Sequence, residues 1–367
     1  MEYIKLEDAC EILDSQRVPI TASERKSGIY PYYGANGIQD YVEDYIFDDD
    51  LVLLAEDGGN FGSKDRAIAY RVSGKCWVNN HAHVLKPRAN IDVDYLCYSL
   101  MFYDTTGLVN GATRQKLTQV AMRQMQIPFV DIDSQRDIVK ELNFVTNLID
   151  KRKQQLKKLD ELVKARFVEL FGGIHDSKMY PYKLVSDLTD VISGGTPSRD
   201  VNEYWEGGTI PWVKTTELQN NYVTEVEEYI TEEGLNNSSA KIVPVGTVLI
   251  AMYGQGKTRG MTAYLGIEAC TNQACACILP SDKINQTFLW QFFVLSYDNL
   301  RDRAKGGNQP NLNGNIIKNY PVLYPPIELQ EQFAAFVKQT DKSKLEVKKS
   351  LEKLELLKNA LMQKYFG

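Results

Sequence analysis

The chain has 367 residues, of which 43% are hydrophobic and 25% are charged, a composition typical of globular rather than disordered proteins. The net charge of −6 argues against a uniformly basic nucleic-acid binder, although a local basic face can oppose the total. The sequence contains no run of about 18 apolar residues, so we expect no membrane-spanning helix. Its first residues are mixed and acidic, unlike a secretory signal. The six cysteines are scattered, which indicates reduced thiols in the cytoplasm.

The first part of the chain predicts a strand-rich segment that is followed by a long helix. Residues 51–55 and 77–85 are β-branched and apolar runs that predict strands, and residues 95–103 predict a short apolar helix. The long helix begins after the start signal Asp-Ile-Asp-Ser at residues 131–134 and ends at Gly172.

The second part of the chain predicts the same order of elements. Residues 245–251 and 271–279 predict strands, and residues 288–298 predict a short apolar helix. Residues 173–256 carry 5 basic and 12 acidic residues, whereas residues 257–325 carry 7 and 4, which is the polarity of a domain with one basic face. We therefore predict an α+β chain made of two mixed, strand-rich domains, each followed by a long helix, with the parts 1–130, 131–172, 173–325 and 326–367.

An internal repeat relates the two halves when the sequence is shifted by 195 residues. The long helices agree better than the domains before them, as expected of a shared scaffold that carries two different recognition domains. The identical pairs are Leu117/Leu312, Ile132/Ile327, Gln135/Gln330, Lys153/Lys348, Leu156/Leu351, Lys158/Lys353, Leu159/Leu354, Leu162/Leu357, Ala165/Ala360, Phe171/Phe366 and Gly172/Gly367.

Apolar residues in both long helices recur at alternating steps of four and three, which is the spacing of a coiled-coil seam. Polar seam residues, such as Arg152 and Lys344, can fix the register at some cost in stability. Two ordinary amphipathic helices in a globular bundle remain the alternative. The first seam is Ile138, Leu142, Val145, Ile149, Arg152, Leu156, Leu159, Val163, Arg166 and Leu170. The second is Phe333, Val337, Thr340, Lys344, Val347, Leu351, Leu354, Lys358, Leu361 and Tyr365.

The motifs on this duplicated frame resemble those of specificity subunits of type I restriction–modification systems, over essentially the whole chain. In the first half the motifs are residues 32–38 (Tyr-Tyr-Gly-Ala-Asn-Gly-Ile), 54–58 (Leu-Ala-Glu-Asp-Gly) and 78–85 (Val-Asn-Asn-His-Ala-His-Val-Leu). In the second half they are residues 193–197 (Ser-Gly-Gly-Thr-Pro), 210–214 (Ile-Pro-Trp-Val-Lys), 254–260 (Gly-Gln-Gly-Lys-Thr-Arg-Gly) and 271–274 (Thr-Asn-Gln-Ala).

The resemblance implies a non-catalytic subunit whose two target-recognition domains are separated by two long helices in an antiparallel coiled coil, with internal pseudo-two-fold symmetry. It also implies partners: double-stranded DNA with a bipartite target, two adenine methyltransferase subunits and, in the full complex, two restriction–translocase subunits. Antiparallel pairing suits half-sites near one helical turn, about 34 Å, apart, and the helix pair would act as a ruler. We expect no cofactor and no metal ion.

Four loops are the candidates for DNA contact, because glycines permit close approach and their polar side chains reach phosphates or bases. They are residues 254–260, their counterpart 58–66, and the matched segments 110–116 and 306–311. The alternative is that they are turns whose Asn and Gln residues bind the backbone, as we expect for residues 32–37. The candidate DNA-binding residues are Gln255, Lys257, Thr258, Arg259, Asn60, Lys64, Arg66, Arg114, Lys116, Asn308, Gln309 and Asn311.

Two rival activities are disfavoured by the sequence. Residues 251–258 match a permissive Walker A loop, but residues 259–266 predict a second strand where a P-loop needs a helix. Methyl transfer lacks its Asp/Asn-Pro-Pro-Tyr/Phe motif, since residues 324–327 are Tyr-Pro-Pro-Ile. A coiled-coil scaffold protein that joins other proteins without recognising DNA remains the alternative function.

The remaining acidic and metal-type residues have structural explanations. Residues 48–50 (Asp-Asp-Asp) predict a solvated turn before a strand, and no nuclease carboxylate cluster is evident. His81 and His83 alternate on the strand predicted at residues 77–85, and Cys275 and Cys277 share a face without the second pair that a zinc site needs. We predict that these four residues belong to the core or to a hydrogen-bonded scaffold.

Overall fold

The computed structural model describes residues 2–111, 114–304 and 311–367. It is α+β, as predicted, and divides into two compact units: unit 1 is Met1–Lys153 with Lys349–Gly367, and unit 2 is Gln154–Lys348. Helices α4 (Ile132–Phe171) and α10 (Ile327–Phe366) contribute residues to both units. The division into recognition domains and conserved helices stays a prediction. No helix among the described residues is long and apolar enough to cross a membrane.

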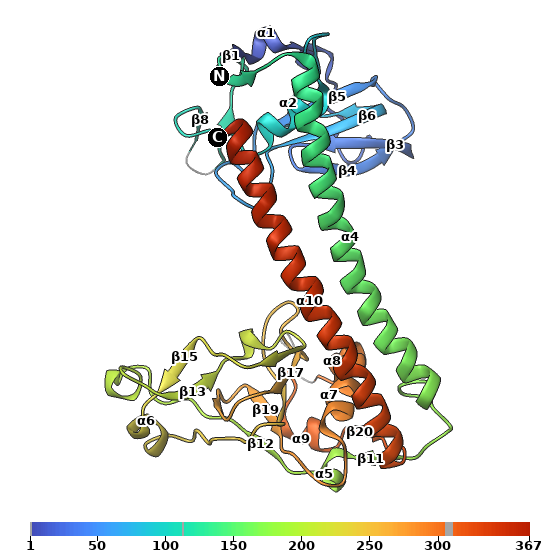
Figure 1. Cartoon of the computed structure of the whole chain (residues 1–367), viewed down its shortest axis with the longest axis vertical. Coiled ribbons are helices and arrows are strands. Elements are labelled where there is room, and N and C mark those ends of the chain that lie inside the picture. Colours follow the sequence, from blue (N-terminus) through green and yellow to red (C-terminus); the bar gives the residue numbers. More distant parts are fainter. Residues whose placement is uncertain (1, 112–113, 305–310) are drawn as a thin grey trace. The chain divides into compact units, whose positions relative to one another are not determined.

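Unit 1 is built on a six-stranded sheet in the order β2-β7-β5-β6-β3-β4, with helix α2 packed on β5 and β6 (Figure 1). Neighbouring strands are antiparallel except β3 and β6. The strands are β1 (Glu2–Lys5), β2 (Cys10–Ile12), β3 (Ser27–Gly34), β4 (Gly37–Val42), β5 (Phe47–Ala55), β6 (Ala69–Val78), β7 (Ala82–Pro87), β8 (Val109–Asn110), β9 (Lys116–Leu117) and β10 (Gln126–Phe129). The helices are α1 (Leu6–Ala9), η1 (Asp14–Gln16), α2 (Val93–Met101) and α3 (Gln119–Arg123).

Unit 2 contains a five-stranded sheet in the order β12-β19-β16-β17-β14 and a three-stranded sheet, β15-β13-β18. The strands are β11 (Tyr182–Leu184), β12 (Val191–Ser193), β13 (Ile210–Val213), β14 (Asn221–Val223), β15 (Glu228–Ile230), β16 (Val248–Ala251), β17 (Thr262–Leu265), β18 (Cys270–Thr271), β19 (Cys275–Ile278) and β20 (Pro321–Leu323). The helices are α5 (Val185–Leu188), η2 (Asn202–Tyr204), η3 (Thr215–Glu217), α6 (Glu232–Asn236), α7 (Gln286–Leu295), α8 (Tyr297–Asp302) and α9 (Gly314–Lys318).

The two units repeat one topology, in agreement with the sequence repeat. The order β2-β7-β5-β6-β3 in unit 1 matches β12-β19-β16-β17-β14 in unit 2, including the parallel pairing of the last two strands. In each unit the first strand pairs antiparallel with the strand just before the long helix, β1 with β10 and β11 with β20.

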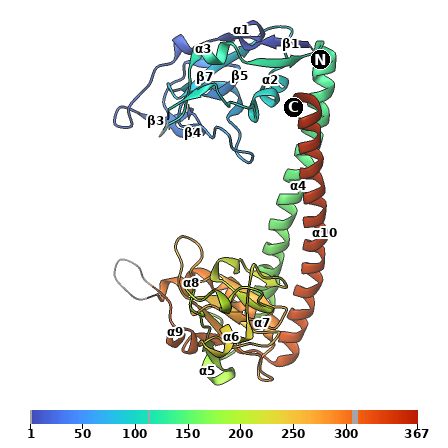
Figure 2. The same cartoon turned by 90° about the vertical axis from the view of Figure 1, so that its left-hand side faces the viewer.

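Segments of α4 and α10 run antiparallel within each unit. In unit 1 the end of α10 lies beside the start of α4 (Figure 2), where Tyr365 donates to Glu141 at 2.6 Å. Further along the same pair, Lys153 lies 3.2 Å from Glu355. In unit 2, the Phe167 ring of α4 packs edge-on against Phe333 of α10. Every position of the two predicted seams is buried or half-buried, as expected of helices that face a partner.

Polar residues in the seams have partners within their own unit. Arg152 donates to the Ser350 hydroxyl at 3.2 Å, and Lys344 lies 2.7 Å from Asp160. Burial lowers the pKa of Lys358, which is the cost of placing an ammonium group in this seam. These directional contacts favour one alignment of the helix segments over a shifted one.

The repeated glutamines join each long helix to its globular part. Gln135 accepts from the Asp92 N–H at 2.8 Å and donates to the Val130 carbonyl at 2.8 Å. Gln330 accepts from the Asn285 N–H at 2.9 Å and donates to the Pro325 carbonyl at 2.8 Å. Asp92 and Asn285 are the N-caps of the equivalent helices α2 and α7, so the identity found in the sequence reflects one conserved bonding pattern.

Replacing Gln330 with leucine is expected to destabilise unit 2 by about 2–3 kcal/mol, because two backbone groups lose their buried partners. Hydrogen exchange should show faster exchange around Asn285 and at the start of α10. The matched control is Gln332→Leu, two residues away and exposed, which should leave exchange in unit 2 nearly unchanged. Equal protection in both variants would contradict the anchoring role.

The structure corrects three local predictions. The strand predicted at residues 271–279 is divided, because β18 ends at Thr271 and β19 begins at Cys275. Residues 48–50 are not a turn, because β5 begins at Phe47 and Asp49 and Asp50 pair with Lys86 and Arg71 on neighbouring strands. The strand predicted at residues 77–85 is interrupted by a turn, so His81 precedes β7 rather than alternating with His83 on it.

Candidate nucleic-acid interface

The two candidate loops of unit 1 lie side by side at the end of β5. The Leu117 N–H donates to the Glu56 carbonyl at 2.7 Å, and the Gly58 N–H donates to the Gln115 carbonyl at 3.3 Å. An isolated antiparallel bridge also joins Asp57 to Lys116. Segments that are about 55 residues apart in the sequence therefore form one continuous surface.

The polar side chains of the first loop, residues 58–66, differ in whether they bind the protein or are exposed to a ligand. Asn60 donates to the Asn36 side chain at 3.1 Å, and Asn36 donates to the Gly58 carbonyl at 3.0 Å. Asn60 therefore helps to hold the loop, and Asn36 acts as the scaffold residue that we predicted. Lys64 and Arg66 are exposed, and the Arg66 N–H is capped by the Ser63 hydroxyl at 3.0 Å.

The second loop of unit 1 presents two cations that are paired with acidic residues of the first. Arg114 Nη2 lies 2.7 Å from Asp57 Oδ1, and Lys116 Nζ lies 3.0 Å from Glu56 Oε1. His81 Nδ1 lies 2.7 Å from the same Asp57 oxygen. Both cationic side chains remain at least half exposed, so carboxylates orient them without covering them.

In unit 2, residues 252–261 connect the antiparallel strands β16 and β17. Gln255 and Lys257 are exposed, and Thr258 and Arg259 are half-buried. Arg301 donates to the Gly256 carbonyl at 2.9 Å and to the Arg259 carbonyl at 2.6 Å, which fixes the loop from α8. Gly254 and Gly256 have φ angles of 143° and 58°, which other residues rarely adopt.

The matched segment of unit 2 is described only in part. The Leu312 N–H donates to the Met252 carbonyl at 3.0 Å, which is the counterpart of the Leu117–Glu56 bond. Asn311, half-buried, is thus placed beside the loop of residues 252–261. The candidates Asn308 and Gln309 lie outside the described residues.

The Walker-like segment is a hairpin, in agreement with the sequence prediction. The strand that follows Lys257 and Thr258 is β17, and in the loop before it the Gly260 N–H donates to the Ala251 carbonyl at 2.8 Å. A nucleotide-binding P-loop instead presents the N-terminus of a helix to phosphate. This geometry does not support ATP binding at residues 251–258.

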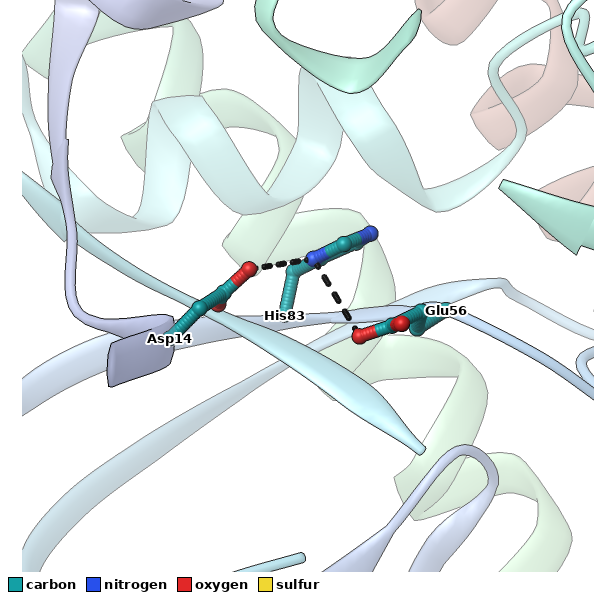
Figure 3. A group of neighbouring side chains, drawn as sticks. All are labelled: Asp14, Glu56 and His83. Atoms are coloured by element: carbon teal, nitrogen blue, oxygen red, sulfur yellow. Dashed lines mark hydrogen bonds and ion pairs between the residues drawn. The ribbon is translucent and has the colours of Figure 1, made fainter. Parts of the chain in front are cut away.

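A buried polar cluster of Asp14, Glu56 and His83 packs beneath the candidate loops of unit 1. Figure 3 shows the His83 ring between Asp14 and Glu56, with Nδ1 at 2.6 Å from Asp14 and 3.7 Å from Glu56. His83 Nε2 lies 2.9 Å from the Leu117 carbonyl oxygen. Both ring nitrogens of His83 therefore face oxygen atoms of the protein. The Arg17 guanidinium also joins the cluster, 2.7 Å from Glu56.

The hydrogen bonds of the cluster set the charge state of its carboxylates. Burial by itself raises the pKa of Asp14, but bonds from His83 and the Val84 N–H, with the charge of Arg17, outweigh it and hold this pKa below its ordinary value. The pKa of Glu56 is also lowered, because bonds from Arg17 and Lys116 outweigh burial.

Asp14, Glu56 and His83 are close enough to offer ligand atoms to one cation. These side chains already contact protein partners, and each ring nitrogen of His83 lies within hydrogen-bond distance of a protein oxygen. The cluster therefore supports a scaffold role for His83, as predicted. The absence of a metal site in this protein stays a prediction.

Sequence reasoning missed the residues that orient the candidate cations. These are Asp57 and Glu56 in unit 1; Arg301 in unit 2, which fixes the backbone of the loop that carries the candidates, was also missed. The motif at residues 54–58 contained the two acidic residues, but their partners lie about 60 residues away and no local pattern links them.

Cys275 and Cys277 belong to the core, as predicted. Both thiols are buried in β19, and burial raises the pKa of Cys277 to about 11.

Comparison with known proteins identifies the family. Residues 1–161 and 180–357 match the model of the type I restriction modification DNA specificity domain, so the chain belongs to this family. A putative type I restriction enzyme specificity subunit of Haemophilus influenzae is 37% identical over 148 residues, covering 40% of this chain and 38% of that one. The MjaIX specificity subunit of Methanocaldococcus jannaschii is 32% identical over 195 residues, covering 50% and 44%. These alignments span less than half the length of either relative.

Longer matches come with lower identity. The MjaVIII specificity subunit of Methanocaldococcus jannaschii is 22% identical over 399 aligned positions, covering 98% of this chain and 91% of that one. The crystal structure of the type I restriction–modification S subunit from M. genitalium has a TM-score of 0.64 at 14% identity, covering 100% and 96%. At this identity the structural likeness concerns the fold.

Proposed function

We propose that this chain is the DNA-specificity subunit of a type I restriction–modification complex. The observation that carries the proposal is the family match over both halves, together with a repeated unit that gathers polar loops at one strand end. In this proposal the chain catalyses no reaction, and adenine methylation and ATP-dependent restriction belong to partner subunits. Two methyltransferase subunits, and in the full complex two restriction subunits, would bind to it.

In the proposed complex each unit recognises one half of a bipartite target. The candidate residues of unit 1 are Asn60, Lys64, Arg66, Arg114 and Lys116, and those of unit 2 are Gln255, Lys257, Thr258, Arg259, Asn308, Gln309 and Asn311. Because the loops differ between the units, the two half-sites should differ in sequence. Net negative charge means that partner subunits would supply much of the phosphate neutralisation.

We further propose that α4 and α10 form one antiparallel coiled coil with pseudo-two-fold symmetry. The antiparallel contacts found within each unit and the buried seams support this. Each helix has 40 residues, which is about 60 Å of rise. Such a pair would hold two recognition domains at a fixed span. The cytoplasmic location stays a prediction.

Methylation mapping of cells that carry this system tests the proposal. We expect one bipartite, adenine-methylated motif that disappears when the chain is deleted and returns when it is supplied again. Binding to the matching duplex should weaken steeply as salt rises, because phosphate contacts release counterions. A methylome that does not change on deletion would favour the scaffold alternative.

A further inference from the structure

Two candidate cations of unit 1, Arg114 and Lys116, are paired with carboxylates, and of these two only Arg114 carries a planar guanidinium fork. Its Nη2 lies 2.7 Å from Asp57 Oδ1 and 3.3 Å from His81 Nδ1, and no described residue hydrogen-bonds to its Nη1. The side chain is 60% exposed and lies against Gly58, whose φ of 62° suits glycine. The result is a planar fork with one edge fixed to the protein and one edge open.

The Asp57 carboxylate is itself fixed. His81 Nδ1 lies 2.7 Å from the same oxygen that binds Arg114, and the Asp57 N–H lies 3.4 Å from the His81 carbonyl. The neighbouring Glu56 is tied to Arg17 and to the buried cluster around His83. Arg114 is therefore supported by a series of contacts that begins in the core, which lowers the entropy cost of presenting its fork to a ligand.

The space beside Arg114 has matching chemistry. A cavity of about 480 Å³ adjoins it and is lined by polar side chains that include Arg25, Gln39, Asn79, Asn80 and His81. Among the described residues, no carboxylate lines this cavity. Asn79 is engaged with Gln39 at 3.1 Å, whereas Asn80 is exposed. Such a surface presents donors and is suited to a ligand rich in acceptors.

We infer that Arg114 recognises a guanine in the half-site of unit 1 and that Asp57 is its positioning residue. The inference rests on the proposed function and assigns one contact within it. A rigid guanidinium fork matches the O6 and N7 acceptors that guanine presents in the major groove. A phosphate contact needs a positive charge but no fixed guanidinium geometry. Lys64, which is exposed on the adjacent loop, fits the role of a phosphate contact better than Arg114 does.

The test enriches bound duplexes from a randomised library, using the full chain co-expressed with the methyltransferase subunits of its system. Wild-type protein should enrich a bipartite motif. Arg114→Ala should lose the guanine preference at one position by roughly 5- to 150-fold and keep the other positions. Arg114→Lys, which keeps the charge but not the fork, should lose the same preference with an unchanged salt dependence.

Asp57→Ala separates positioning from folding. It should relax the same guanine position while non-specific affinity holds or rises, because one negative charge is removed beside the DNA. The matched control is Arg71→Ala, an arginine that is 38% exposed and paired with Asp50 and Asp94 on another part of unit 1. This control should leave the motif intact.

Two negative results have different meanings. If wild-type protein enriches no motif, the proposed function fails. If it enriches a motif but Arg114→Ala keeps every guanine, or weakens all sequences equally with a shallower salt dependence, the assignment of Arg114 to a base is wrong.

Discussion

Replacing Asp14 with alanine is expected to destabilise unit 1 by about 3–5 kcal/mol, the range for breaking a buried ion pair. The substitution removes the carboxylate 2.6 Å from His83, whose ring is fully buried. It also removes the acceptors of the Val84 N–H and the Gln119 side chain. Asp14→Asn should cost less, because the amide oxygen can still accept a hydrogen bond.

Hydrogen exchange would localise the Asp14→Ala effect, with faster exchange in β5, β7 and the residues around Leu117 and unchanged exchange in unit 2. The matched control is Glu43→Ala, which removes an exposed pair with Lys26 and should change little. Protection in unit 1 equal to that of wild type would mean that the cluster does not hold the candidate surface.

The same cluster gives unit 1 a pH dependence of defined sign. The pKa values of Asp14 and Glu56 are lowered in the folded chain, so on acidification the unfolded chain takes up their protons first. Their stabilising contribution is therefore complete above about pH 5 and is lost progressively as pH falls through the lower folded values. Asp14→Ala should flatten this acid dependence as measured by thermal denaturation of unit 1.

The long helices were predictable because their signals are local and repeated. Asp131 caps α4 through a bond from the Ser134 N–H at 2.9 Å, and Gly172, with a φ of 77°, ends it. The seam spacing follows from helical geometry alone. The identity of Gln135 and Gln330 was visible in the sequence, but its cause, the tie to the N-caps of α2 and α7, required coordinates.

The candidate surface was predictable only in outline. Glycine and polar residues marked the loops, but the pairing of Arg114 with Asp57 joins segments 57 residues apart, and that of His83 with Asp14 spans 69. The alternation of His81 and His83 predicted one continuous strand. In the structure the Asn79 side chain accepts from the His81 N–H at 2.8 Å where the chain turns, and nothing in the sequence pattern indicated this contact. Such contacts depend on the tertiary fold, which no local pattern specifies.

Adding one heptad to both long helices is expected to lengthen the spacer between the half-sites and to abolish recognition of the original target. Duplicating residues 150–156 in α4 and 345–351 in α10 keeps the alternation of four and three, and the duplicated segments occupy matched places in the repeat. Seven residues add about 10.5 Å of helix, close to three base pairs at about 3.4 Å each.

The measurement is the methylated motif of cells that express the lengthened chain. The half-site sequences should be unchanged and the spacer longer by about three base pairs, because the recognition loops are untouched. A chain with the same two segments scrambled at their exposed positions only, at wild-type length, should keep the original motif. An unchanged spacer in the lengthened chain would mean that α4 and α10 do not set the distance between the two recognition domains.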